Sequence, residues 1–264
     1  MRNLLLIGLW AAMTAPAQMM VPRLEKPAVI DGNLAEWRDA AFTDGVWDIH
    51  RLRRSPWYDP ARNRLTDHGN EPRPEEDLAA RYYTAWDDTY LYLGAEVKDN
   101  VNDVSDPAHE PKRWYYKDSI CWFIEAPRQA RGQNFGEGDN AFCFVIDDKK
   151  PDYAAWWRHG APGKKYIEEP LPKNAVTWAL KRKPGSGDFV LEARVAMKPT
   201  LGASTPAWTA PKIGDRYGME IVHCDPDGGD YGGHFLIYGT GDDDSTWGVM
   251  ELAGPLAPVE RKSK

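Results

Sequence analysis

Residues 81–99 constrain the fold of this chain more than any other segment. The second half alternates strictly between an apolar and a more polar set of side chains: Leu91, Leu93, Ala95 and Val97 against Tyr90, Tyr92, Glu96 and Lys98. A period of two is that of a β-strand with one packed face and one face in water. The residues 87–89 favour a turn, because Asp and Thr side chains bond to nearby backbone. We therefore predict an antiparallel β-hairpin.

The same kind of pattern recurs along the chain. It predicts further strands over residues 119–125, 140–147, 175–181, 188–196, 216–223, 234–238 and 246–252. Helical periodicity is almost absent, and one short helix is expected within residues 34–41. Regular short strands separated by turn signals are typical of a β-sandwich. We predict an all-β fold, an antiparallel β-sandwich of the jelly-roll type, as a single domain over residues 22–255.

Two long segments interrupt this pattern, at about residues 43–78 and 148–172, and we predict both as irregular insertions. Connections of that length are usually functional or loosely ordered. The first contains Trp47, Trp57 and Tyr58, so we expect it to fold over a surface. Residues 256–264 form a charged tail.

The N-terminus has the features of a secretory signal peptide over residues 1–17. Arg2 precedes a short apolar run, and Ala15, Pro16 and Ala17 form an A-x-A cleavage site. The run is too short to span a bilayer, and no second apolar run is long enough for an anchor. We expect cleavage after Ala17 and a secreted or periplasmic protein without a membrane anchor.

The composition limits the partners. The net charge is −7, and without a basic footprint we expect no nucleic-acid partner. The chain has 12 Trp and 12 Tyr residues. Large rings are used for cross-strand packing in sheets and for stacking against the faces of sugars, and the sequence leaves both uses open.

Three cysteines, Cys121, Cys143 and Cys224, are too few for a disulfide framework. Each lies in an apolar alternating run, which favours small buried core residues. Cys121 and Cys143 fall in two strands that are able to be neighbours, and export permits a disulfide. The sequence does not decide whether they pair.

Nothing in the sequence marks a catalytic centre. A P-loop and a GxSxG elbow are absent, and no carboxylate pair has a spacing that singles it out as a glycosidase pair. The histidines lack the paired spacing of zinc sites. We read the chain as non-catalytic.

Five landmarks occur in the order found in one known family. They are residues 30–37 with Ile30, Asp31, Gly32 and Trp37; residues 86–99; Lys117, Asp118 and Ser119; residues 190–195; and residues 216–227 with Trp247 and Gly248. Together they resemble the family 9 carbohydrate-binding modules, within the wider DOMON-like β-sandwiches. The resemblance covers about residues 28–252.

The resemblance implies a calcium-supported sandwich that binds the ends of sugar chains and often accompanies a glycoside hydrolase. It implies Asp99 and Asp118 as Ca²⁺ ligands, since hard oxygen ligands suit that ion. It implies Trp114 and Tyr115 as sugar-binding rings, and we add Trp157 as a third predicted ligand-binding residue. We expect a carbohydrate ligand, a role in carbohydrate catabolism, and a separate glycoside hydrolase as a partner.

The sequence departs from the family pattern at three places in the sugar site. No aromatic residue stands at 239–242, where the second ring of the clamp is expected. Cys121 occupies the position of a carboxylate, and the apolar run 142–145 replaces polar residues on the neighbouring strand. Trp247 is more typical of a core position.

Two alternatives follow from the same resemblance. Related DOMON-like sandwiches hold haem b in electron-transfer proteins through axial Met, His or Lys ligands. The candidate ligands here are Met197, Met219, Met250, His223 and His234. The other alternative is a structural surface module with a vestigial cleft.

Overall fold

The computed structural model describes residues 18–43, 53–54, 77–102, 113–132, 135–147, 155–161, 164–206, 208–226, 234–239, 241 and 243–256. The predicted signal peptide, most of the 43–78 insertion and the tail beyond residue 256 lie outside these ranges.

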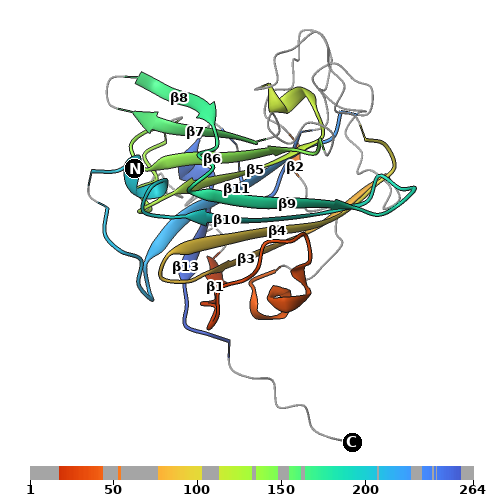
Figure 1. The fold of residues 1–264 in the computed structure, drawn as a ribbon. Coiled ribbons are helices and arrows are strands. Elements are labelled where there is room, and N and C mark those ends of the chain that lie inside the picture. Colours follow the sequence, from red (N-terminus) through yellow and green to blue (C-terminus); the bar gives the residue numbers. More distant parts are fainter. Residues whose placement is uncertain are drawn as a thin grey trace, which may run out of the picture.

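Two β-sheets form the molecule (Figure 1). Within the described residues the larger sheet has nine strands, in the order β1-β13-β11-β5-β6-β7-β8, with β12 beside β11 and β2 beside β12. Its strands are β1 (Gln18–Val21), β2 (Arg53–Arg54), β5 (Ser119–Glu125), β6 (Asp139–Val145), β7 (Ala155–Ala161), β8 (Lys164–Pro170), β11 (Arg216–Cys224), β12 (His234–Leu236) and β13 (Gly248–Leu252). The smaller sheet has the order β3-β4-β10-β9, from β3 (Leu78–Trp86), β4 (Tyr90–Asp99), β9 (Val176–Arg182) and β10 (Phe189–Ala196).

The main core lies between the two sheets. The smaller sheet contributes the predicted apolar face of β4, and β5 of the larger sheet contributes Ile120, Trp122 and Ile124. Apart from the parallel pair β1–β13, the strand pairs are antiparallel. The predicted hairpin is present as β3 and β4, and the Asp87 carboxylate accepts the backbone N–H groups of Thr89 and Tyr90 at 2.7 Å in the turn. The predicted all-β sandwich is confirmed.

The opposite face of the hairpin does not simply meet water, as the alternation had suggested. Tyr92 on β4 is fully buried under the N-terminal segment, which contributes Leu24, Leu34 and Trp37. This segment has two 3₁₀ turns, η1 (Leu34–Glu36) and η2 (Arg38–Ala40), instead of the one short helix expected there. The buried Glu192 carboxylate on β10 anchors the segment, accepting from the Asp31 and Gly32 N–H groups at 2.8 Å and from the Trp37 indole N–H at 2.7 Å.

The segment 148–172 is not an irregular connection, because it contains β7 and β8. The period of two is broken within β7, where the register shifts between His159 and Ala161. Gly160 lies between them, and a side chain at this position would collide with the Gly136 carbonyl. The close approach of two backbones therefore requires glycine and conceals the strand in the sequence.

Candidate functional site

The outer face of the larger sheet, away from the main core, carries a second apolar cluster. Cross-strand register places its side chains in rows, because directly opposed residues project from the same face. One row runs from Val222 on β11 through Cys121 and Cys143 to Trp156 on β7. The next row runs through Phe123, Ala141, Arg158 and Glu168 on β5 to β8. We call this surface the outer face.

Cys121 and Cys143 are directly opposite each other and form a disulfide in the floor of the outer face. The structure thus decides the pairing that the sequence left open. Cys224 is a free, fully buried thiol on β11. Burial in apolar surroundings raises the pKa of Cys224 above its ordinary value, so the thiol stays protonated.

Aromatic rings gather around the floor. Trp114 lies in η4 (Trp114–Tyr116), the turn that precedes β5, and its ring contacts Phe123 edge-on at 6.3 Å between centroids. Phe123 also contacts Phe135 at 5.7 Å and Trp247 at 5.6 Å. Trp247, which follows η7 (Asp244–Thr246), is buried in this cluster, in keeping with the packing role expected for it.

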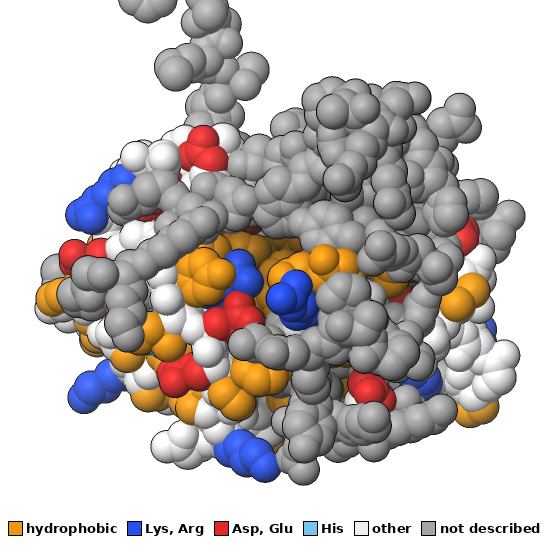
Figure 2. Space-filling model, turned by 90° about the horizontal axis from the view of Figure 1, so that it is seen from above, with side chains coloured by type: hydrophobic (Ala, Val, Ile, Leu, Met, Phe, Trp, Pro, Cys, Tyr) orange, Lys and Arg blue, Asp and Glu red, His pale blue; other side chains and the backbone are white. Residues whose placement is uncertain are grey.

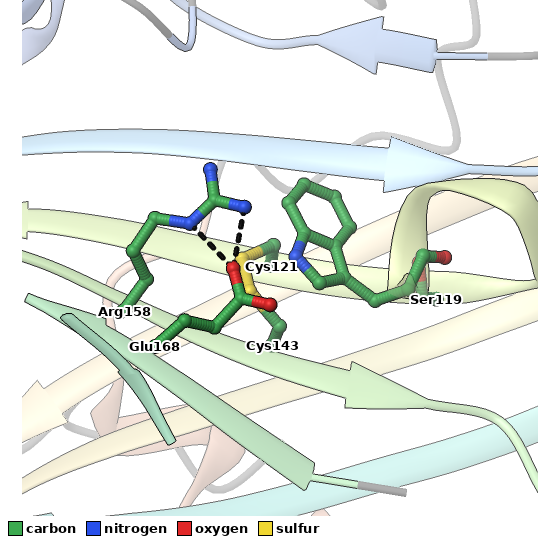
Figure 3. The surroundings of a disulfide bond; sticks show 6 residues. Ser119, Cys121, Cys143, Arg158 and Glu168 are labelled. Atoms are coloured by element: carbon green, nitrogen blue, oxygen red, sulfur yellow. Dashed lines mark hydrogen bonds and ion pairs between the residues drawn. A yellow bond between two sulfur atoms is a disulfide. The ribbon is translucent and has the colours of Figure 1, made fainter. Parts of the chain in front are cut away.

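Arg158 and Glu168 form the charged centre of the outer face. Their side chains point toward one another from β7 and β8, on the side of the sheet that carries the disulfide (Figure 3). The Glu168 Oε2 atom accepts from Arg158 Nη2 at 2.6 Å and from Nε at 2.9 Å. The side chains are 13% and 14% exposed, so the pair is shielded and yet remains in contact with solvent.

Three rings surround the Arg158 guanidinium. Its Cζ atom lies 4.5 Å from the centre of the Tyr166 ring, 5.3 Å from that of Phe135 and 5.9 Å from that of Trp114. A cation over aromatic faces is attracted by their quadrupoles, which holds the guanidinium in place. Tyr166 is 36% exposed, whereas Phe135 and Trp114 are buried. Tyr166 is thus the ring of this set that solvent reaches.

The surface seen from above in Figure 2 shows hydrophobic side chains in a hollow. Basic and acidic side chains lie among them. A concave surface that combines apolar and charged groups is the usual setting of a small-ligand site.

Tyr115, a predicted sugar-binding ring, is half-buried beside Trp114, with 5.4 Å between the ring centroids. Burial raises the pKa of its hydroxyl. Tyr115 and Arg158 both contact Trp114, since the Arg158 Cζ atom lies 5.9 Å from the centre of the Trp114 ring. Its carbonyl contacts the buried His234 Nε2 at 2.7 Å, and burial lowers the pKa of His234 to about 4, which keeps that ring neutral at physiological pH.

Trp157 does not share a face with Trp114 and Tyr115. It points into the main core, is 5% exposed, and donates its indole N–H to the buried Asn140 Oδ1 at 3.1 Å. Its neighbour Trp156 packs against the outer-face cluster. The structure therefore brings together two of the three predicted rings, and places Trp157 away from them because adjacent residues in a strand point to opposite sides.

Asp99 and Asp118 are both buried; Asp99 ends β4 of the smaller sheet, and Asp118 directly precedes β5 of the larger sheet. The Ile146 N–H donates to the Asp118 carbonyl at 2.9 Å, and the Ile146 carbonyl accepts from Arg182 Nη2 on β9 at 2.7 Å. The Asp99 N–H bonds to the Asp188 carboxylate next to β10 at 3.2 Å. Neither predicted calcium ligand belongs to a group of three or more described side chains whose carboxylate, imidazole or thiol ligand atoms lie within 4.8 Å of one another.

The five residues considered as haem ligands are all buried. Met197, Met219 and Met250 belong to the main core. The His223 Nδ1 atom lies 2.7 Å from the Tyr82 hydroxyl, and His234 contacts the Tyr115 carbonyl. These positions give no support to the electron-transfer alternative.

Glu220 on β11 holds the chain that follows β12. Its fully buried carboxylate accepts from the N–H groups of Ile237 at 2.7 Å, Tyr238 at 3.0 Å and Gly239. Burial raises the pKa of Glu220 to about 7, although these donors oppose the shift. This anchored segment leads into residues 239–242, where the sequence lacks the second ring of a clamp.

Sequence reasoning missed Arg158, Glu168, Tyr166 and Phe135. The first three lie on β7 and β8, in a segment predicted to have no regular structure. Phe135 lies in the loop between β5 and β6, in the left-handed region at φ 55°. A usable signal was the alternation of residues 164–170, which places Tyr166 and Glu168 on one side of a strand.

The fold and the outer face define a β-sandwich with an aromatic-lined surface site. The profile of the family described as carbohydrate family 9 binding domain-like matches residues 56–255, and the chain belongs to this family. The resemblance drawn from the five landmarks is confirmed. The family is one of binding modules.

Solved structures agree with this assignment at the level of the fold. A carbohydrate-binding module of family 9 from Caldicellulosiruptor kristjanssonii in complex with cellotriose is 16% identical, with a TM-score of 0.54, over 94% of this chain and 99% of that one. The same kind of module from that organism in complex with glucose gives 16% identity and a TM-score of 0.56, over 92% and 99% of the two chains. A putative carbohydrate-binding protein from Bacteroides uniformis gives 10% identity and 0.57, over 90% and 100%.

No match was found among curated proteins. Across the described ranges, no helix is both long and apolar enough to cross a membrane.

Proposed function

We propose that this chain is a secreted, non-catalytic carbohydrate-binding protein whose sugar site is the outer face around Arg158 and Glu168. One observation carries the proposal: the exposed Tyr166 ring lies directly beside a half-buried charged pair. Sugars present apolar C–H faces together with hydroxyls that both donate and accept hydrogen bonds. An aromatic ring, a donor and an acceptor at one place match both properties.

The charged pair keeps capacity for a ligand. A guanidinium has five N–H donors, and Glu168 engages those on Nε and Nη2. The Glu168 carboxylate has two oxygens, and both hydrogen bonds from Arg158 go to Oε2. Arg158 is thus able to donate to one sugar hydroxyl while Glu168 accepts from the next, with Tyr166 under the ring and Tyr115 at the side. This arrangement replaces the carboxylate that Cys121 cannot supply.

The wider role is inferred from the relatives. The names of two similar structures specify cellotriose and glucose, so gluco-configured sugars are the first ligands to test. We expect the protein to present its ligand to a separate glycoside hydrolase in carbohydrate catabolism. Export rests on the signal-peptide features of residues 1–17. Calcium at Asp99 and Asp118 stays a prediction.

The test is calorimetric titration of the calcium-loaded protein with cello-, xylo- and pectic oligosaccharides. Saturable heat with one series, lost in Tyr166→Ala, is the expected result. Tyr90→Ala on the smaller sheet is a matched control. The Arg194 Cζ atom lies 4.9 Å from the centre of the Tyr90 ring, so this variant also removes a ring that contacts an arginine. Unchanged heat in Tyr166→Ala would move the site elsewhere. The absence of heat with every series, from a protein that unfolds cooperatively, would refute carbohydrate binding.

A further inference from the structure

Three acidic residues from distant parts of the chain meet at one end of the outer face. Glu125 ends β5, Asp139 begins β6, and Asp244 begins η7. Each is 1% exposed, and one carboxylate oxygen from each lies within 4.8 Å of the others. Glu125 and Asp139 are directly opposite each other in the ladder. Like charges in such a pair repel, and burial strengthens the repulsion.

The protein compensates part of this charge. Arg128 Nη1 donates to Glu125 Oε2 and to the Asp244 carbonyl, both at 2.5 Å, and Gly218 leaves room for this contact. The Asp244 carboxylate accepts from the Gly132 N–H at 2.6 Å. Three carboxylates buried this close together are costly unless cations or protons compensate their charge.

Asp139 supplies an independent indication of a missing partner. Its Oδ2 atom accepts from the Gly136 N–H at 2.6 Å, whereas its Oδ1 atom is buried without a hydrogen-bond partner. The Gln129 side chain, which donates to the Glu137 carbonyl beside this turn, also has a buried Oε1 atom without a partner. Unsatisfied buried oxygens are rare in folded proteins, and an ion is one of the accepted explanations.

From these contacts we propose that Glu125, Asp139 and Asp244 bind a divalent cation of the Ca²⁺ type. Two oxygens on opposite sides of Ca²⁺ lie about 4.8 Å apart, because each is about 2.4 Å from the ion. The separations in this cluster fit that limit. Carboxylate and amide oxygens are the hard ligands that Ca²⁺ takes in irregular geometry. The site is distinct from Asp99 and Asp118.

The bound ion would join three segments that are far apart in the sequence: the start of the β5–β6 loop, its end at β6, and the turn before β13. Phe135 belongs to this loop, and Trp247 follows the turn. Both rings pack in the outer-face cluster. The ion therefore would stabilise the rim of the face. This proposal does not depend on the proposed function, because its test measures folding.

A proton on Asp139 is the competing occupant, since burial and the Asp244 charge raise the pKa of Asp139 to about 8. The experiment is thermal unfolding of the full chain after treatment with a chelator, with Ca²⁺ or Mg²⁺ then added at pH 8. We expect Ca²⁺ at 100 times its Kd to raise Tm by about 5 °C or more, and Mg²⁺ to do less.

Variants locate the ion. Asp139→Asn and Asp244→Asn are expected to reduce the Ca²⁺-dependent rise in Tm. Asp87→Asn, at a buried aspartate in the β3–β4 turn, is the matched control and should keep the full rise. A full rise in Asp139→Asn would overturn the proposal. So would a wild-type protein that does not respond to Ca²⁺, or an Asp139→Asn variant that is as stable without Ca²⁺ as the wild type is with it.

A direct measurement of ion binding tests the proposal if the Asp139 and Asp244 variants do not fold. Tb³⁺ replaces Ca²⁺ at oxygen sites and emits when a nearby tryptophan is excited. Trp247 is close, because its carbonyl accepts from Arg128 Nη2 at 3.2 Å. We expect sensitised emission from the wild-type protein and from Asp118→Asn, displaced by Ca²⁺. Absence of emission in Asp118→Asn would assign the ion to the site predicted at Asp99 and Asp118, and would overturn the proposal.

Discussion

The outer faces of the two sheets differ in what covers them. The smaller sheet is covered by the protein's own N-terminal segment, where Leu24, Leu34 and Trp37 pack on Tyr92. The larger sheet instead presents a charged pair and a partly exposed ring, Arg158, Glu168 and Tyr166, above its apolar floor. Alternating strands thus serve structure on the outer side of one sheet and a candidate ligand site on the outer side of the other.

The buried polar groups show what separates the two faces. The Glu192 carboxylate under the smaller sheet accepts from three donors at 2.7–2.8 Å, all supplied by the segment that covers it. Arg158 and Glu168 satisfy one another only in part and keep contact with solvent. A fully paired interior group fixes the chain, whereas a partly paired one is free to take an external partner.

Replacing Glu192 with Ala should have the largest effect on stability. It leaves three donors without an acceptor and detaches the N-terminal cover, so we expect a loss of about 4 kcal/mol in the free energy of unfolding. Urea denaturation measures this, and Glu192→Gln, which keeps one acceptor oxygen, should lose less. Sugar affinity should be unchanged. A loss below about 1 kcal/mol would show that the cover is held by packing alone.

Replacing Cys121 and Cys143 together with Ala should cost somewhat less. The bridge spans a sequence separation of 22, for which the loss of chain-entropy stabilisation is about 3 kcal/mol. Reduction of the wild-type protein should give the same shift in the urea midpoint. Cys224→Ala is the control, since this thiol is buried but unbridged, and it should not respond to reductant. Equal stability of oxidised and reduced wild type would contradict the prediction.

Replacing Arg158 with Ala should weaken sugar binding by about 10- to 100-fold, the effect of losing a charged hydrogen bond worth about 1.5–3 kcal/mol. Calorimetry measures the change in Kd. Arg194→Ala on the smaller sheet removes a comparable contact, between Arg194 and Tyr90, and should leave Kd unchanged. Similar losses in both variants would mean that the two faces are not functionally different.

Replacing Glu220 with Gln should change the pH dependence of the free energy of unfolding more than its value at any one pH. Burial raises the Glu220 pKa from 4.5 to about 7, so the folded state retains a proton that the unfolded state releases. The contribution of the protonated Glu220 side chain to the free energy of unfolding is fully present below about pH 4.5. It is lost as the pH rises to about 7. The stability of wild type relative to Glu220→Gln should therefore fall across this range and stay constant above it. Urea denaturation at several pH values tests this, and a difference independent of pH would refute it.

Local pattern predicted the fold well where one face packs against the other sheet. The hairpin and the strands β5, β6, β10 and β11 follow from alternation, because the core rewards a strict period of two. The strand β7 was not predicted, because Gly160 interrupts its alternation. This glycine is needed for close contact with the Gly136 backbone, which the sequence alone does not show.

The candidate site was less predictable for the same reason. Trp114 and Tyr115 were named from the family pattern, but the pair at the centre, Arg158 and Glu168, lies on the strands that were missed. Trp157 was selected as a ring, although only the strand register reveals that Trp156 and not Trp157 faces the site. Glu125, Asp139 and Asp244 meet only because a loop and a turn about 100 residues away fold onto each other, which no local pattern encodes.

The parallel pairing of β1 with β13 also has a mechanical meaning. Gln18 pairs with Val249 and Val21 with Leu252, so the start of one strand and the end of the other lie at opposite ends of a shared ladder. Tension applied through Gln18 and Leu252 pulls the two strands past one another and loads their hydrogen bonds together instead of one at a time. Unfolding by force applied at these two points therefore requires the hydrogen bonds of the ladder to break together.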